Sequence, residues 1–285
     1  MSERAERFTE PCTFHGEGPF WDAPNDRLLL VDMLEGAVVD VAPDGTTGRR
    51  TLAGVAAALR ARRHGGYLLA TEDRFLLLGP DLAPQTELPP VFVDPRLRMN
   101  DGGCDPQGRF YIGTMAYAET AGAGTLYRLD TDRSVSVVLT GVTISNGLQW
   151  TRDGATVLYA DTPTGRVDRF DFDPDSGAFS SRRPFAAVTG PGLPDGLAID
   201  EEDGVWVALW GGGAVHRYDA SGRLDLVVEL PVTQVTACTF GGPDLRTLFI
   251  TTSRSGVEPG EQPEAGAVFR YPAGVRGAVP HAFAG

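Results

Sequence analysis

The amino-acid sequence predicts an all-β protein, and two observations support that prediction. Strand-length runs of β-branched and aromatic residues recur along the chain: RLLLVDM (27–33), RFYIGTM (109–115), TVLYADT (156–162) and GVWVALW (204–210). Helical periodicity is rare by comparison. Its best example is LAGVAAALRARR (52–63), which equally suits a connection followed by a strand.

A third observation is a strand–turn–strand rhythm that recurs six times. The units cover residues 18–45, 65–82, 102–132, 147–177, 196–222 and 236–272. Their spacing of about 40 to 50 residues is the period of a four-stranded propeller blade. We therefore expect a six-bladed β-propeller that spans residues 1–285 as a single domain. Residues 1–9 are expected to pair with AVPHAFAG (278–285) and so close the ring.

Each unit supplies its own strand and turn signals, in chain order. In the first unit RLLLVDM follows the turn APND, and in the third RFYIGTM follows PQG. The fourth and fifth place TVLYADT and GVWVALW after RDG and EEDG, and the sixth places TLFITTS after GGPD. The second unit, GGYLLATEDRFLLLGPDL, matches the pattern least well.

Composition indicates a globular protein and argues against several functions. Of the 285 residues 42% are apolar and 22% charged, and the net charge is −13. Nucleic-acid binding is not expected, because it needs clustered Lys and Arg. No apolar run reaches membrane length, and the N-terminal stretch lacks an apolar leader segment, so no membrane role is expected. Cys12, Cys104 and Cys238 form no CxxC pair, which favours a reduced, cytoplasmic protein without disulfides.

Oxygen-bearing side chains recur where the innermost strands of the units should meet. They are Glu17 in GEGPFW, Asn100 and Asp101 in MNDGGCD, Asn146 in SNGLQW and Asp195 in PDGLAI. Equivalent points of different blades converge at the mouth of a propeller channel. Each of NDG, SNG and PDG alone is typical of a turn. Their recurrence at the same point of the repeat favours a shared site.

Glu17 poses the sharpest chemical question, because it stands between two glycines and just ahead of Phe20 and Trp21. A buried carboxylate needs an arginine, backbone N–H groups or a metal ion as its partner. Two carboxylates and an amide oxygen suit Ca²⁺ or Mg²⁺, and Zn²⁺ or Mn²⁺ can also use them. We therefore predict that Glu17, Asn146 and Asp195 hold one divalent ion and leave positions open for water and substrate.

Other catalytic arrangements fit the sequence less well. The four histidines show no HExxH spacing, and GxSxG is absent. His15 lies two residues before Glu17 and can face the same side of a strand, although a packing role is the simpler interpretation. Trp21, Trp150 and Trp206 are expected in the core.

The motifs together resemble the regucalcin and gluconolactonase family, also called the senescence-marker-protein family. The residues that carry the resemblance run in order from Glu17 to the C-terminus: GEGPFW, RMNDGGCDPQGRFYIGTM, ISNGLQWTRDG, LPDGLAIDEEDGVWVALWGGGAVHRYD, TACTFGGPDLRTLFITTS and QPEAGAVFRY. The resemblance implies a six-bladed propeller with one divalent metal near the channel mouth. It also implies hydrolysis of aldonolactones, in carbohydrate metabolism.

The resemblance assigns roles to individual positions. Glu17, Asn146 and Asp195 match the metal ligands, with Asp195 also expected as the catalytic base, and Arg98 and Asn100 match residues that hold the sugar lactone. After GTMA, animal members carry an acidic pair whose second residue binds sugar. Tyr117 and Ala118 occupy those positions in this chain, and Glu119, one residue later, is the remaining candidate for substrate binding.

Three functions remain open at this point. The first is a metal-dependent lactonase acting on a sugar lactone. The second is a broader esterase or phosphotriesterase, because a metal that polarises a carbonyl group can also polarise a phosphoryl group. The third is a non-catalytic calcium-binding or protein-interaction propeller, although Arg98 and Asn100 would have no use in a protein that only buffers calcium.

Overall fold

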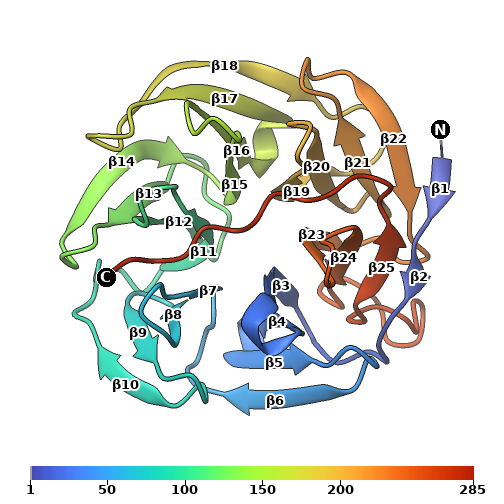
Figure 1. Ribbon diagram of the computed structural model, residues 1–285, viewed down its shortest axis with the longest axis horizontal. Helices are drawn as coiled ribbons and strands as arrows, with labels where there is room; N and C mark the ends of the chain where they lie inside the picture. The colour runs from blue at the N-terminus through green and yellow to red at the C-terminus, as the bar shows by residue number, and fades with distance from the viewer. Residues whose placement is uncertain (1) are drawn as a thin grey trace.

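Six sheets, five of four strands and one of five, are arranged around a central channel in the described part of the chain (Figure 1). The computed structural model describes residues 2–285. No α-helix occurs among these residues, and none of their helical turns is long and apolar enough to cross a membrane. The predicted six-bladed β-propeller is therefore confirmed, including its least certain second blade.

The blades are given from the channel outward. Blade one is β3 (Gly16–Asp22), β4 (Arg27–Asp32), β5 (Ala37–Val41) and β6 (Thr47–Thr51). Blade two is β7 (Ala58–Ala61), β8 (Tyr67–Ala70), β9 (Phe75–Leu78) and β10 (Pro84–Glu87). Blade three is β11 (Leu97–Cys104), β12 (Phe110–Ala116), β13 (Gly124–Leu129) and β14 (Val135–Val142).

The second half of the ring repeats this order. Blade four is β15 (Ser145–Trp150), β16 (Thr156–Asp161), β17 (Arg166–Phe172) and β18 (Phe179–Ala187). Blade five is β19 (Leu193–Ile199), β20 (Val205–Trp210), β21 (Ala214–Tyr218) and β22 (Leu224–Glu229). Blade six is β23 (Val235–Gly241), β24 (Thr247–Thr252) and β25 (Phe269–Pro272). Three 3₁₀ turns, η1 (Ala23–Asn25), η2 (Met33–Glu35) and η3 (Thr162–Thr164), follow strands of blades one and four.

The N-terminal segment closes the ring, but not with the partner that the sequence suggested. β1 (Ser2–Arg4) runs parallel to β22, and β2 (Glu6–Arg7) pairs with β25 as the outermost strand of blade six. The expected pairing of residues 1–9 with 278–285 is therefore wrong for the described residues; Met1 lies outside them. β25 offers a free edge of backbone N–H and C=O groups, which the N-terminal strand satisfies.

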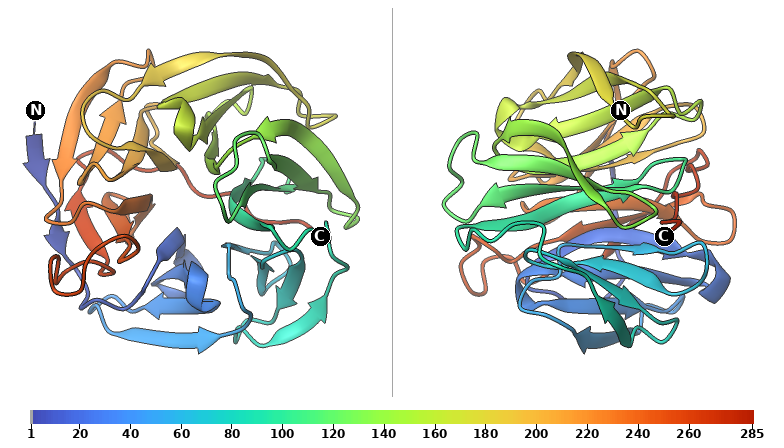
Figure 2. Two further views of the ribbon diagram at one scale, coloured as in Figure 1. Left: turned by 180° about the vertical axis from the view of Figure 1, so that it is seen from behind. Right: turned by 90° about the vertical axis from the view of Figure 1, so that its left-hand side faces the viewer.

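Residues 277–285 instead cross the channel (Figures 1 and 2). Ala278 N donates a hydrogen bond to Ile199 O in blade five, and Phe283 N donates one to Ala61 O in blade two. Both carbonyls stand at the last residue of an inner strand. The C-terminal segment therefore covers the end of the channel where the inner strands finish, and leaves open the end where they begin.

The core consists of apolar layers between neighbouring blades. Leu68 and Phe75 of blade two pack in one cluster with Phe110 and Ile112 of blade three. The three tryptophans lie in such layers as predicted: Trp206 is fully buried, Trp150 is 3% exposed and Trp21 stacks on Phe249. The ambiguous stretch 52–63 is a connection followed by β7.

Candidate metal centre

Six of the seven polar residues selected from the sequence line one cavity of about 90 Å³, whereas Asp101 lines a separate pocket. Glu17 comes from β3, Arg98 and Asn100 from β11, Asn146 from β15 and Asp195 from β19, whereas Glu119 follows β12. The cavity lies toward the beginnings of the inner strands, opposite the C-terminal segment. The repeat logic thus brings together residues separated by as many as 178 positions (195 − 17) in the sequence.

Breaks in strand register direct these side chains toward the cavity. The pairing of inner strand with second strand shifts between Glu17 and Phe20 in β3, and between Ser145 and Leu148 in β15. The same shift occurs between Pro194 and Leu197 in β19. Such bulges bend a strand and re-aim a side chain. The turn-like tripeptides therefore lie inside the inner strands, at bulges, and not in loops ahead of them.

Glycine follows each of the three predicted ligands, and at Gly147 and Gly196 the inner strands come very close together. A Cβ on Gly147 would lie 2.3 Å from the Leu197 side chain and 2.7 Å from Asp195 O. A Cβ on Gly196 would lie 2.5 Å from Ala237 Cβ. Only glycine fits at these two positions without moving a neighbouring inner strand.

The carboxylates of the cavity are buried with few partners. Glu17 is 3% and Asp195 5% exposed. Glu17 Oε2 accepts one hydrogen bond, from Gly18 N at 2.9 Å. Asp195 Oδ1 is buried and finds no hydrogen-bond partner among residues 2–285. Two charges that would repel each other thus share a small cavity with little compensation.

The pKa values also indicate that these carboxyl groups lack compensating partners. Burial, together with repulsion from Asp101, raises the pKa of Glu17 to about 8. Burial and repulsion from Glu17 raise the pKa of Asp195 well above its ordinary value, although Arg98 acts in the opposite direction. Burial also raises the pKa of Asp101, despite an ion pair with Arg60 at 4.0 Å. The protein alone does not stabilise the charged forms of these carboxyl groups.

The oxygen atoms present suit a divalent cation. No group of three His, Cys, Asp or Glu side chains within residues 2–285 is arranged to hold a metal ion. The candidate set instead combines the carboxylates of Glu17 and Asp195 with the amide of Asn146, all hard oxygen donors. The unpartnered Asp195 Oδ1 is the observation that fits such an ion best.

Arg98 and Asn100 lie beside these oxygens. Arg98 is 7% exposed, and its Nη1 donates to Asn100 Oδ1 at 2.5 Å and to Met99 O at 3.1 Å. Nη1 also contacts Met33 Sδ at 3.0 Å. Asn100 Nδ2 donates in turn to Asn146 Oδ1 at 3.0 Å. Arg98 is thus held rigidly, and none of these contacts uses its Nη2.

Tyr117 stands where the resemblance places an acidic residue. Its ring faces the Arg98 guanidinium at 5.9 Å, and its Oη donates to Glu72 at 2.5 Å. Glu119 is exposed but lines the cavity, whereas Ala118 and Tyr117 line a separate groove. An aromatic ring therefore lies next to the Arg98 guanidinium at a position where the resemblance implies an acidic residue.

His15 also lines the cavity. Its Nδ1 lies 2.7 Å from Ser253 Oγ, and its ring meets Trp210 edge to face at 5.8 Å. Burial and the nearby Arg98 lower the pKa of His15 to about 4, so the ring is neutral near pH 7. His15 is therefore a neutral packing residue in the wall of the cavity.

Sequence reasoning missed two buried aspartates that fix the chain ahead of the ligands. Asp32 Oδ1 accepts from Phe14 N at 3.1 Å and His15 N at 2.8 Å. Asp161 Oδ1 accepts from Thr143 N at 3.2 Å and Ile144 N at 2.9 Å. The anchored amides precede Glu17 and Asn146 by three and two residues in both blades. The signal was present in VDM and YADT, at the same point of the first and fourth units.

Comparisons with known proteins agree with this architecture. The family model described as the SMP-30/gluconolactonase/LRE-like region matches residues 15–254. Regucalcin of Oryctolagus cuniculus is 36% identical over 284 residues, with 95% of each chain covered. The putative sugar lactone lactonase YvrE of Bacillus subtilis is 36% identical over 278 residues, with the same coverage.

A solved structure is similar as well. The calcium-binding protein regucalcin of Agrobacterium tumefaciens matches with a TM-score of 0.92 at 27% identity, covering 99% of this chain and 98% of the other. Together with the family model and the 36% identical relatives, this result shows that the chain belongs to the SMP-30/gluconolactonase/LRE-like family.

Proposed function

We propose that the protein is a lactonase that opens a sugar lactone by hydrolysis and uses one divalent metal ion, in the manner of a gluconolactonase. The observation that carries the proposal is the buried, unpartnered Asp195 Oδ1, which shares a cavity with a second carboxylate and with Arg98. Membership of a family that includes a relative named as a putative sugar lactone lactonase supports it.

Each residue has a role in this proposal. Glu17, Asn146 and Asp195 would hold the ion, which would polarise the carbonyl group of the lactone as a Lewis acid. Asp195 takes a proton from the attacking water as the water oxygen bonds to the acyl carbon. The bond from the acyl carbon to the ring oxygen then breaks, and that oxygen takes the proton from Asp195, so lactone and water become a hydroxy acid.

The remaining polar groups position the substrate. Arg98 presents Nη2 toward the carbonyl or hydroxyl oxygens of the lactone, and Asn100 keeps Arg98 in place through the 2.5 Å hydrogen bond. Glu119 accepts from a substrate hydroxyl at the open side of the cavity. Burial lowers the pKa of Arg98, yet nearby acidic groups, Glu17 and Asp195 among them, favour its charged form.

A panel of five- and six-membered aldonolactones tests the proposal. Metal-stripped protein is assayed by proton release, with Ca²⁺, Mg²⁺, Mn²⁺ and Zn²⁺ added back singly. Turnover restored by a metal, and lost in Glu17→Gln, would support the lactonase. Turnover of aryl esters or phosphotriesters alone would favour the broader hydrolase.

One outcome would favour a different class of protein. Stoichiometric metal binding without turnover of any of these substrates would contradict the lactonase. It would favour a calcium-binding propeller, because the Agrobacterium relative is described as a calcium-binding protein.

A further inference from the structure

We infer that Thr162 is a positioning residue of the metal centre, whose hydroxyl decides which end of the Asn146 amide faces the ion. The inference rests on the proposed function, because it concerns the same site. Thr162 directly follows β16, is 5% exposed and lines the cavity. None of the roles assigned above requires it.

The hydrogen bonds that start at Arg98 run in one direction only. A guanidinium can only donate, so Asn100 must turn its Oδ1 toward Arg98 Nη1. The Asn100 amide nitrogen then donates to Ser145 O at 2.8 Å and to Asn146 Oδ1 at 3.0 Å. From this side, Asn146 must present its oxygen.

At the opposite end of the hydrogen-bond chain lies Pro194 O, a backbone carbonyl that can only accept. Thr162 Oγ1 donates its single proton to that carbonyl at 2.8 Å. Toward Asn146, the same hydroxyl can therefore only accept, and Asn146 Nδ2 donates to it at 2.7 Å. Both ends of the chain of hydrogen bonds thus require one orientation of the Asn146 amide.

The orientation matters for a cation. With Nδ2 bound to Thr162, Asn146 Oδ1 keeps a lone pair beyond the one that accepts from Asn100. A flipped amide would aim N–H groups at the ion, which would repel it. Groups that orient metal ligands typically change metal affinity about 10- to 100-fold when they are removed.

Thr162 also couples two ligands. Pro194, whose carbonyl accepts from the hydroxyl, immediately precedes Asp195. One hydroxyl therefore links the side chain of Asn146 in β15 to the backbone just ahead of Asp195 in β19.

The test uses calorimetric titration of metal-stripped full-length protein with CaCl₂, MgCl₂, MnCl₂ or ZnCl₂. The tightest-binding ion is then used for the variants. Thr162→Val, which keeps the shape and removes the hydroxyl, is expected to weaken binding about 10- to 100-fold. Thr162→Ser restores the hydroxyl and is expected to bind nearly as tightly as the unsubstituted protein.

Thr71→Val is the matched control. Thr71 directly follows β8 of blade two, as Thr162 follows β16, and its buried hydroxyl also donates to a backbone carbonyl, that of Arg74 at 3.0 Å. It touches none of the proposed ligands. Its variant should lose thermal stability to a similar degree and leave the metal dissociation constant unchanged.

A double-mutant cycle distinguishes orientation from general loosening. A carboxylate presents an oxygen whichever way it turns, so the Thr162→Val penalty should largely vanish in an Asn146→Asp background. An equal penalty in both backgrounds, or none in either, would overturn the inference while leaving the metal centre intact. Failure of the unsubstituted protein to bind any of the four ions would instead overturn the metal centre of the proposed function.

Discussion

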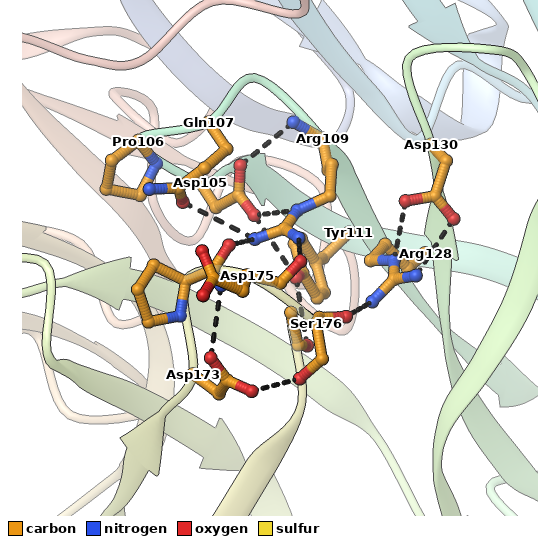
Figure 3. A network of polar contacts seen from close by, with 12 residues as sticks. Asp105, Pro106, Gln107, Arg109, Tyr111, Arg128, Asp130, Asp173, Asp175 and Ser176 are labelled. Atoms are coloured by element: carbon orange, nitrogen blue, oxygen red, sulfur yellow. Dashed lines mark hydrogen bonds and ion pairs between the residues drawn. The ribbon is translucent and has the colours of Figure 1, made fainter.

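Two buried aspartates, Asp105 and Asp195, show how differently the two ends of the channel treat a carboxylate. Asp105 follows the last residue of β11 and is fully buried. It accepts from Arg109 N at 2.9 Å, from Arg109 Nε at 2.5 Å and from Tyr111 Oη at 3.2 Å (Figure 3). Asp195 is about as buried, yet its Oδ1 has no partner among the described residues.

The surroundings of Asp105 are also satisfied. The side chain of Arg109 reaches blade four, where its Nη2 donates to Pro174 O at 2.9 Å and its Nη1 to Asp175 O at 3.2 Å (Figure 3). Asp105 therefore joins two blades through a complete network. A buried polar group that is fully hydrogen-bonded contributes structure, whereas one left open is a candidate for binding.

The largest difference is expected in catalysis. Asp195→Asn should lower the turnover of the preferred lactone by about 10²- to 10⁴-fold, because it removes the proposed base. Asp105→Asn, assayed at a temperature where it remains folded, should keep kcat within a few-fold. Steady-state kinetics of both variants measure this contrast. Equal losses of kcat would contradict the claim that Asp195 serves catalysis and Asp105 serves structure.

The next effect is expected in stability. Asp105→Asn should lower the free energy of unfolding by about 3 to 5 kcal/mol, because Arg109 remains as a buried charge without its partner. Urea denaturation followed by tryptophan fluorescence measures the loss. A change below about 1 kcal/mol would mean that the network in Figure 3 contributes little.

A smaller effect concerns the aspartates that anchor the chain ahead of the ligands. Asp161→Ala should weaken metal binding about 10- to 100-fold, because the amides of residues 143 and 144 lose their acceptor and Asn146 is no longer held. Asp168→Ala is the control, since Asp168 is equally buried but pairs with Arg166 and Arg182 away from the cavity. Weaker metal binding by Asp161→Ala than by Asp168→Ala would support the anchoring role of Asp161, and equal affinities would contradict it.

The smallest effect is expected at Tyr117. Tyr117→Phe removes the hydrogen bond to Glu72 but keeps the ring over Arg98, so it should cost no more than about 1 kcal/mol of stability. Tyr117→Ala removes the ring as well and should raise KM more than it lowers kcat. Michaelis–Menten constants for both variants test this, and unchanged constants for Tyr117→Ala would exclude a role in substrate positioning.

Much of the architecture could be predicted from the sequence. The six units repeat strand and turn residues at a blade-like spacing, and their inner-strand motifs pointed to the residues that the fold brings into one cavity. The repeats made the site predictable. Equivalent positions of the blades converge at the channel mouth, so the individual contacts did not have to be known. The three tryptophans could likewise be assigned to the core from their place in the repeat.

Other features could not be predicted. The strand supplied by residues 6–7 depends on a free edge of β25 that is more than 260 residues away in sequence. The roles of Asp161 and Thr162 depend on which backbone groups lie opposite them. Strand register determines those groups, and residue type alone does not. For the same reason, the bulges at Asn146 and Asp195 resembled ordinary turns in the sequence.

The most direct test of the central claim compares thermal unfolding of the unsubstituted protein and Asp195→Asn, each with and without bound metal at neutral pH. Without metal, Asp195→Asn should melt at the higher temperature, because burial and the repulsion from Glu17 disfavour the charged Asp195. With metal, the order should reverse, because only the unsubstituted protein keeps both carboxylate ligands. If metal-free Asp195→Asn melts below the metal-free unsubstituted protein, Asp195 is a structural residue like Asp105, and the account of an open metal centre is wrong.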